Sequence, residues 1–466
     1  MVHPPARFVP VQIRPHPDSS HPTWTSSTLP IQRRERPSLA RRWSGVQAFE
    51  GAPAVRSPAI PTGDFPLPPG ALRVGAIHQK ETFPWQRPGP MDQPSKDLLP
   101  TYSRLAGTGS FVPERRVTNH DLFGLPGIRR AFDVERARGS LKQIADPSGL
   151  SPEEVFHAWA VQVTGIRARR MVGLDGSPTT EEMCAEAAQR AMDRAGITPG
   201  EVDLVLVATV TPRDSVPNAA CTVGHLLGMP QVGGFTLNGA CTGFIHALTV
   251  AHGFIRSGMA RCVVVAAGDT LSRITNYEDP TTAVLFADGA AAAVLTAGPT
   301  AGILGPPFLS GEYEREHLFQ IGQGWEEPDR PHPKLRMGGG PRVLRRAIMA
   351  MEEAASQALV RAGVGWESVD LVIPHQANLR ITRGLEAQLK LTRGRVVHTI
   401  EEYGNCSAAT VGIALDESLR GEGRVNKDGT GTDGGSRIPD PARILLTAVG
   451  GGYTTAALVM DVETHG

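Results

Sequence analysis

The feature that most constrains the fold of this chain is an internal repeat. The segment EAAQRAMDRAGITPGEVDLV (186–205) aligns without a gap on EAASQALVRAGVGWESVDLV (353–372), at an offset of 167 residues. Each copy has the pattern of an Ala-rich helix that leads into a buried strand, and Gly196 marks the end of the first helix. A match of this length indicates two similar halves. Because helices alternate with nearly continuous apolar strands, the sequence predicts a duplicated α/β body whose parallel-rich sheets are covered by helices.

Other short apolar runs also have the pattern of strands, and they span 102–113, 203–210, 235–241, 262–268 and 290–298. The run at 235–241 leads into a predicted helix, 242–257, with an apolar face. Residues 124–158 are polar and show no clear period. Residues 421–441 are rich in Gly, Asp and Arg, which predicts a surface loop.

The N-terminal 100 residues differ from the rest of the chain, because they hold 19 of its 39 prolines. Such a segment buries too little apolar surface to offset its ordering entropy, so we expect a disordered extension over 1–100. A transit peptide is an alternative, although the proline density opposes the amphipathic helix that such peptides form. The predicted organisation is therefore an extension (1–100), an N-terminal half (101–298) and a C-terminal half (299–466).

Charge and cysteine content exclude several classes of protein. The formal net charge is zero, which gives no field that favours nucleic acid or an anionic membrane as partner. The five cysteines are scattered and lack CxxC spacing, which argues against a disulfide framework and a metal site and for a reducing compartment. With no bilayer-length apolar stretch and no secretory signal, we expect a cytoplasmic protein without a membrane partner.

Cys241 is the first candidate for chemistry, because it lies where a strand ends and a helix begins. The positive end of the helix dipole favours the thiolate at such a position, and Gly239 and Gly243 allow close approach of a substrate. A free cysteine is also commonly a small buried apolar residue, so position alone does not assign it a function.

His375 and Asn405 are candidates in the second half. His375 follows a buried strand and could exchange a proton with a substrate, although a lone histidine is more often structural. Asn405 lies at a second strand-to-helix junction, where its amide could donate to an enolate oxygen or serve only as a helix cap. Cys241 and Cys406 take roughly equivalent places in the two halves, so we expect both helix starts to face one cleft. The amides of Gly450–Gly452 could form an oxyanion hole, although glycine runs are often only turns.

Taken together, these places resemble the beta-ketoacyl-ACP synthase III family. The resemblance covers the chain from about residue 102 to its end, and the order of its motifs makes it specific. The motifs are GTGSFVP (107–113), TGIRAR (164–169), VPNAAC (216–221), GACTGF (239–244), FADGAAAAVL (286–295), PHQANLRI (374–381), YGNCSAAT (403–410) and GGGYT (450–454).

The resemblance implies an α/β thiolase fold, five-layered (αβαβα) and built from two duplicated halves of one chain, and it implies that two such chains form a homodimer. It also implies a site in which Cys241 is the acylated nucleophile and His375 and Asn405 stabilise an enolate. By the same resemblance the amides of Cys241 and Gly451 form the oxyanion hole. The remaining implied contacts are coenzyme A adenine on Trp159, pantetheine at Asn378, the acyl carrier protein at Arg380 and the acyl pocket at Val216.

Three departures from the family pattern change what we expect of the substrate. The family has arginines that bind the nucleotide of coenzyme A at two places, which this chain fills with Val163 and with the pair Pro280 and Thr281. The acyl donor is therefore expected to be either coenzyme A or an acyl carrier protein. Val216 stands where the family often has a Phe that blocks the acyl pocket, which predicts longer acyl primers.

The expected reaction is acylation of Cys241 and then decarboxylative Claisen condensation with a malonyl thioester, giving a 3-oxoacyl thioester. It needs no metal or redox cofactor. A thiolase would need a second catalytic Cys near the C-terminal glycines, and residues 440–466 contain none. A plant-type polyketide synthase usually has HisProGlyGly in place of PHQAN. An acyltransferase that forms esters or amides without decarboxylation, and a non-catalytic partner subunit, remain alternatives.

Overall fold

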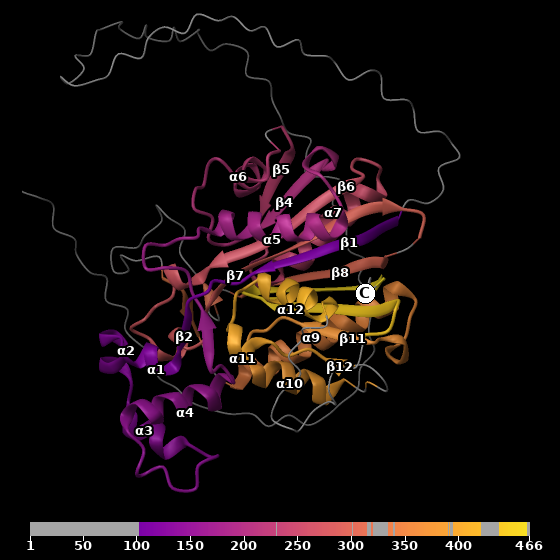
Figure 1. Ribbon diagram of the computed structural model, residues 1–466. Coiled ribbons are helices and arrows are strands. Elements are labelled where there is room, and N and C mark those ends of the chain that lie inside the picture. The colour runs from indigo at the N-terminus through magenta and orange to yellow at the C-terminus, as the bar shows by residue number, and fades with distance from the viewer. Residues whose placement is uncertain are drawn as a thin grey trace, which may run out of the picture. The chain divides into compact units, whose positions relative to one another are not determined.

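Two five-stranded sheets with corresponding strand orders form the frame of the protein (Figure 1). The first sheet has the order β1 (Tyr102–Phe111), β7 (Asp288–Gly298), β6 (Cys262–Thr270), β4 (Leu204–Ala208) and β5 (Gly233–Leu237). The second has the order β8 (Ile303–Glu314), β14 (Gly452–Val462), β13 (Ala442–Gly450), β11 (Leu371–Pro374) and β12 (Arg395–Val396). In each sheet the last three strands are parallel and the first two pair antiparallel, so the duplication predicted from the repeat is visible in the topology.

The computed structural model describes residues 102–229, 231–300, 302–314, 318–319, 334–338, 341–389, 391, 395–420 and 438–463. These residues belong to one compact unit, Pro90–Gly466. The predicted extension over 1–100 and most of the predicted loop at 421–441 lie outside the described residues.

Helices cover both sheets and fill the space between them, which gives five layers. The first sheet is covered by α5 (Thr180–Ala195) and α6 (Ala219–Leu226), and the second by α9 (Pro341–Ala362), against which α10 (Leu379–Gln388) packs. The central layer consists of α7 (Gly243–Arg256) and α12 (Ala409–Leu419), each of which contacts strands of both sheets. This αβαβα stack is the architecture that the sequence predicted.

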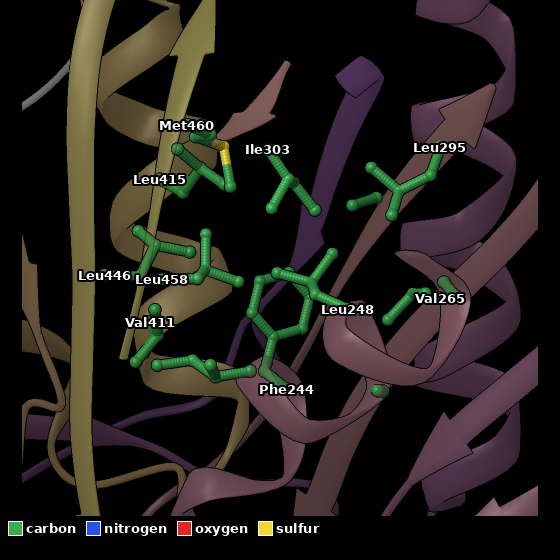
Figure 2. Close-up of a cluster of buried hydrophobic side chains, with 14 of the residues drawn as sticks. Phe244, Leu248, Val265, Leu295, Ile303, Val411, Leu415, Leu446, Leu458 and Met460 are labelled. Atoms are coloured by element: carbon green, nitrogen blue, oxygen red, sulfur yellow. The ribbon is translucent and has the colours of Figure 1, made fainter. Parts of the chain in front are cut away.

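The central layer supplies the largest apolar cluster. Figure 2 shows Phe244 and Leu248 of α7 facing Val411 and Leu415 of α12, and all four side chains are buried. Strand residues close the cluster on both sides, among them Val265 and Leu295 from the first sheet and Leu446, Leu458 and Met460 from the second. Because truncation of such a side chain to alanine costs about 2–5 kcal/mol, this cluster firmly joins the two halves.

The remaining elements are α1 (Asn119–Phe123), α2 (Pro126–Ala131), α3 (Val134–Ser140), α4 (Pro152–Thr164), α8 (Pro280–Ala283), α11 (Ile400–Tyr403) and the strand pairs β2 (Arg116–Thr118) with β3 (Ala168–Arg170) and β9 (Leu318–Phe319) with β10 (Arg336–Met337). Segment 124–158, which had no clear sequence pattern, thus forms most of three helices. One of them, α4, begins with a capping box between Ser151 and Glu154 and ends at Gly165, whose φ is 79°.

Candidate active site

Cys241 lies in a single 3-10 turn, Ala240–Thr242, between β5 and α7. Ala240 has a φ of 46°, a left-handed conformation that is unfavourable for a residue with a side chain. The Oδ1 atom of Asn238 accepts a hydrogen bond of 3.3 Å from the Ala240 amide, which stabilises this turn. The turn holds the thiol of Cys241 in a buried position at the start of the helix, where the sequence predicted it.

The second half contains the same turn, and it corrects one prediction. Ser407 has a φ of 54°, and the Oδ1 atom of Asn405 accepts a hydrogen bond of 2.9 Å from the Ser407 amide. Ala240 and Ser407 are separated by the repeat offset of 167 residues. The structural counterpart of Cys241 is therefore Ala408, so Cys406, which was predicted to take a roughly equivalent place, lies two positions before it.

Ser407 connects the three residues that the sequence singled out. Its hydroxyl oxygen is 3.9 Å from the sulfur of Cys241, and its amide holds the side chain of Asn405. Its carbonyl oxygen accepts a 2.9 Å hydrogen bond from the Thr410 hydroxyl, whose oxygen is 2.7 Å from Nδ1 of His375. The structure thus joins a thiol from the first half to an imidazole and an amide from the second.

Asn405 is held in place by the backbone of the first half. Its amide donates to the Leu285 carbonyl and its carbonyl accepts from the Ala287 amide, each over 3.0 Å. Gly404 precedes it with a φ of 71°, and a Cβ at that position would lie 2.8 Å from the Cβ of Ala287. Because only glycine fits this approach, Gly404 allows Asn405 to reach the opposite half.

His375 follows β11 and is buried. Its amide donates to the Thr447 carbonyl over 2.8 Å, which fixes the backbone at the end of the strand. Burial lowers the pKa of the imidazole from 6.5 to about 3, because a charged ring would lose its hydration. The ring is therefore neutral at physiological pH.

Burial raises the pKa of the Cys241 thiol from 9.0 to about 12. The Ser407 hydroxyl opposes this shift, the negative charge of Asp269 adds to it, and the amides of Gly451 and of Cys241 itself also favour the thiolate. The expected advantage of a helix start is thus outweighed by the cost of removing a thiolate from water. At neutral pH the thiol therefore carries its proton in the free protein.

The C-terminal glycines lie against the nucleophile. A Cβ at Gly450 would be 3.1 Å from the Cys241 nitrogen and 2.8 Å from the Thr454 hydroxyl oxygen, so a larger residue would displace the turn. The amides of Gly451 and of Cys241 both donate toward the sulfur of Cys241, and both oppose the rise of its pKa. This arrangement brings together the two amides that were predicted to form an oxyanion hole.

Asp269, at the end of β6, was missed by the sequence analysis, as were Ser407 and Thr410. The Oδ1 atom of Asp269 accepts four hydrogen bonds from Thr209, Val210 and Thr211. These bonds fix the segment after β4. Burial raises the pKa of this carboxyl group, and its hydrogen bonds oppose the rise. Ser407 and Thr410 lie inside a motif that the sequence analysis used, YGNCSAAT, but serine and threonine at a helix start usually suggest only caps.

The other predicted contact residues lie on α4, on α10 and in the segment before α6. Trp159 is half-buried on α4, with its ring 5.1 Å from that of Phe132. Asn378 is the N-cap of α10, and its side-chain amide donates to the Val163 carbonyl over 2.9 Å. Arg380 is exposed on α10. Val216 is 87% exposed in the segment between β4 and α6.

The described part of the chain contains no group of three or more His, Cys, Asp or Glu side chains arranged to hold a metal ion. None of its helices combines the length and the apolar character needed to span a membrane.

Comparison with known proteins gives a family. Residues 235–307 match the family model of 3-oxoacyl-[acyl-carrier-protein] synthase III, and residues 359–462 match the model of its C-terminal part. The chain is 36% identical over 362 residues to a beta-ketoacyl-[acyl-carrier-protein] synthase III of Xanthomonas campestris pv. campestris, an alignment that covers 77% of this chain and 98% of that protein. The chain belongs to the 3-oxoacyl-[acyl-carrier-protein] synthase III family.

Two solved structures support this assignment. The enzyme of Aquifex aeolicus is 31% identical, with a TM-score of 0.62 over 77% of this chain and 99% of that one. The priming beta-ketosynthase of the R1128 polyketide pathway is also 31% identical, with a TM-score of 0.65 over 78% and 97%. This synthase III family member has the thiolase fold and is a condensing acyltransferase, as the sequence predicted.

Proposed function

We propose that this protein is acylated on Cys241 by an acyl thioester and then condenses the acyl group with a malonyl thioester. Loss of carbon dioxide from the malonyl group drives the second step, and the product is a 3-oxoacyl thioester. One observation carries the proposal: Ser407 links the Cys241 thiol, the Asn405 amide and, through Thr410, the His375 imidazole. A thiol nucleophile beside a neutral imidazole and an amide suits carbon–carbon bond formation through an enolate.

In the first step the thiolate of Cys241 attacks the acyl carbon. The amides of Cys241 and Gly451 already lie beside the sulfur, so they can donate to the oxyanion of the tetrahedral intermediate. The carrier thiol then leaves, and the acyl group remains on Cys241.

In the second step Asn405 and His375 stabilise the enolate left by decarboxylation. The Ser407 amide occupies Oδ1 of Asn405, so Nδ2, which is a donor, is the end of the side chain that remains for a substrate oxygen. A neutral His375 can add a second donor without placing a charge in the site. These groups need no metal or redox cofactor.

A buried apolar cluster lies beside Asn405. Leu285 and Phe286, which contact the backbone of Asn405, belong to this cluster together with Leu271 and Leu379. The small Val216 supports the proposal of primers longer than acetyl. Acylation measured across a series of primer lengths tests this, and an enzyme that accepts only acetyl would refute it.

The proposed macromolecular partners are the acyl carrier protein and a second copy of the chain. Arg380, exposed at the start of α10, is the proposed carrier contact, and Trp159 and Asn378 are the proposed contacts of the substrate arm. Strand β5 ends the first sheet, and Phe235 on it is partly exposed, which supports a dimer that pairs this edge with its copy. Sedimentation measures that dimer. We propose that the enzyme acts in the cytoplasm, in fatty-acid or polyketide synthesis.

Intact-mass spectrometry with a panel of acyl-CoA and acyl-carrier donors tests the proposed chemistry. Wild-type protein should gain one acyl group, Cys241→Ala should gain none, and the matched control Cys406→Ala should still be acylated. Release of labelled carbon dioxide from a malonyl thioester then separates this reaction from ester or amide formation. If acyl-enzyme forms but carbon dioxide is never released, the acyltransferase alternative holds and the proposal fails.

A further inference from the structure

The turn that carries Gly451 lies at an irregularity of the second sheet. Gly451 alone joins the end of β13 to the start of β14. On its other edge β14 pairs with β8, where Gly452 lies opposite Glu314 and Thr454 lies opposite Gly311. One residue of β14 thus faces two residues of β8, which is a β-bulge. Because the backbone ladder is disrupted at a bulge, the position of the turn depends on side-chain contacts.

The side chain of Arg346, in the second turn of α9, spans this bulge. Its guanidinium forms ion pairs with Glu312 and Glu314 of β8. Its Cζ atom also lies 4.4 Å from the centre of the Tyr453 ring. Tyr453 is the residue of β14 that lies between the two paired positions. The guanidinium therefore connects the two strands where their backbones do not pair.

The contact between Arg346 and Tyr453 can reach the turn through the backbone of β14. The Tyr453 side chain is 7% exposed and packs among apolar side chains that include residues of α9. A cation over the face of an aromatic ring is attracted by the ring, and more strongly where water is excluded. Because Tyr453 is two residues from Gly451, a displacement of its ring would displace the turn.

The opposite face of this hairpin lies against the nucleophile. The hydroxyl oxygen of Thr454 is 3.1 Å from that of Thr242, the residue after Cys241. Gly450 approaches so closely that a Cβ there would be 3.1 Å from the Cys241 nitrogen. The turn is therefore held between the helix start that carries the thiol and the outer helix α9.

We infer that Arg346 is a positioning residue, which acts through Tyr453 to hold the Gly451 amide beside Cys241. This inference rests on the proposed function, because the Gly451 amide is a proposed donor to the oxyanion. An amide stabilises an oxyanion only if it is already directed at the place where the charge develops, so a small displacement of the turn slows the reaction. A contact that served only stability would leave the turn and the reaction of the folded protein unchanged.

Hydrogen exchange of the full-length protein, followed in its peptides by mass spectrometry, tests whether Arg346 holds the turn. Arg346→Met keeps a long side chain but removes the charge, so exchange in residues 449–455 should become about tenfold faster while exchange in β6 stays the same. Arg346→Lys keeps a cation over the ring and should restore most of the protection. Arg342→Met is the matched control, because Arg342 is exposed one turn earlier in α9.

Thermal unfolding checks that each variant is folded. Tyr453→Leu is a second variant, which removes the ring but keeps an apolar side chain, and it should also speed exchange in residues 449–455. If exchange there is the same in the wild-type protein, Arg346→Met and Tyr453→Leu, the inference is overturned.

The acyl-enzyme reports on the amide itself. With a ¹³C-labelled acyl carbonyl on Cys241, the C=O stretching band moves to higher frequency when the hydrogen bonds to its oxygen weaken. Arg346→Met should show this shift. Its acylation should be about tenfold slower at saturating donor, with the half-saturating donor concentration unchanged, because a displaced amide weakens the transition state more than donor binding.

The rescue variant and the outcomes separate this inference from the proposed function. Arg346→Lys should acylate close to the wild-type rate. A wild-type band and a wild-type rate in Arg346→Met would contradict the inference even if exchange at the turn is faster. If the wild-type protein takes no acyl group from any donor, the proposed function fails, while hydrogen exchange still decides whether Arg346 holds the turn.

Discussion

Replacing Asn405 with aspartate tests whether this side chain serves decarboxylation and not acylation of Cys241. The two side chains have the same shape, and an aspartate oxygen can still accept the 2.9 Å hydrogen bond from the Ser407 amide. The other end changes from a donor to an oxygen with a negative charge, and at 5% exposure it is shielded from water. Loss of one donor to a developing oxyanion slows a reaction about 10²- to 10³-fold, and repulsion by the new charge adds to this effect. We therefore expect decarboxylation to fall at least about 10³-fold while Cys241 is still acylated.

The two half-reactions must be measured separately for this variant. Intact-mass spectrometry follows acylation, and a malonyl thioester labelled in its free carboxylate follows the release of carbon dioxide. Asn276→Asp is a control variant, because the side-chain oxygen of Asn276 likewise accepts a hydrogen bond, over 3.0 Å, from the amide two residues further on, that of Glu278. Decarboxylation by Asn405→Asp at the wild-type rate would refute the reasoning. An equal loss of both half-reactions, with unchanged thermal unfolding, would refute it as well.

Three further predictions concern stability and reactivity. Asp416→Ala should lower the free energy of unfolding by about 3 kcal/mol, because the buried carboxylate of Asp416 accepts two hydroxyl hydrogen bonds and pairs with Arg194. A loss below about 1 kcal/mol in a denaturant titration would contradict this. As the pH falls from 7 to 5, His375 should lower the free energy of unfolding by about 2 kcal/mol, because folding lowers its pKa from 6.5 to about 3 and only the unfolded chain gains a proton in this range. The variant His375→Gln should lack this part of the pH dependence. Cys241 should react with iodoacetamide at pH 8 more slowly than the exposed Cys221, because burial raises its pKa to about 12, and peptide mass spectrometry would show the reverse order if this is wrong.

Local sequence patterns predicted the elements whose ends depend on a single residue. The helix predicted to end at Gly196 is α5, and Gly196 follows it with a φ of 65°, because the left-handed turn after a helix favours glycine. Segment 124–158 was not predicted, since its apolar side chains pack across short helices and not along one period. Phe132 of this segment, for example, packs on Phe156 of α4 with ring centroids 4.9 Å apart. The capping box at Ser151 was nevertheless readable from the sequence.

Some residues of the candidate site were likewise predictable from local motifs, and others were not. Cys241, His375 and Asn405 were predicted from motifs, and the structure connects all three through Ser407. The roles of Ser407 and Thr410 depend on how one half packs on the other, which no local pattern reports. The pKa of Cys241 was expected to be low from its helix start, but the amount of water excluded from a thiol is set by tertiary packing, and here that term is larger.

The backbone bonds between Asn405 and residues 285–287 also bear on how such a protein can be altered. A chimaera that joins the N-terminal half of one relative to the C-terminal half of another keeps both sets of motifs. It orients the Asn405 side chain correctly only if both parent proteins have the same backbone contacts between these two segments. For the same reason, partial separation of the two halves on warming would abolish activity while the helices and strands are still intact.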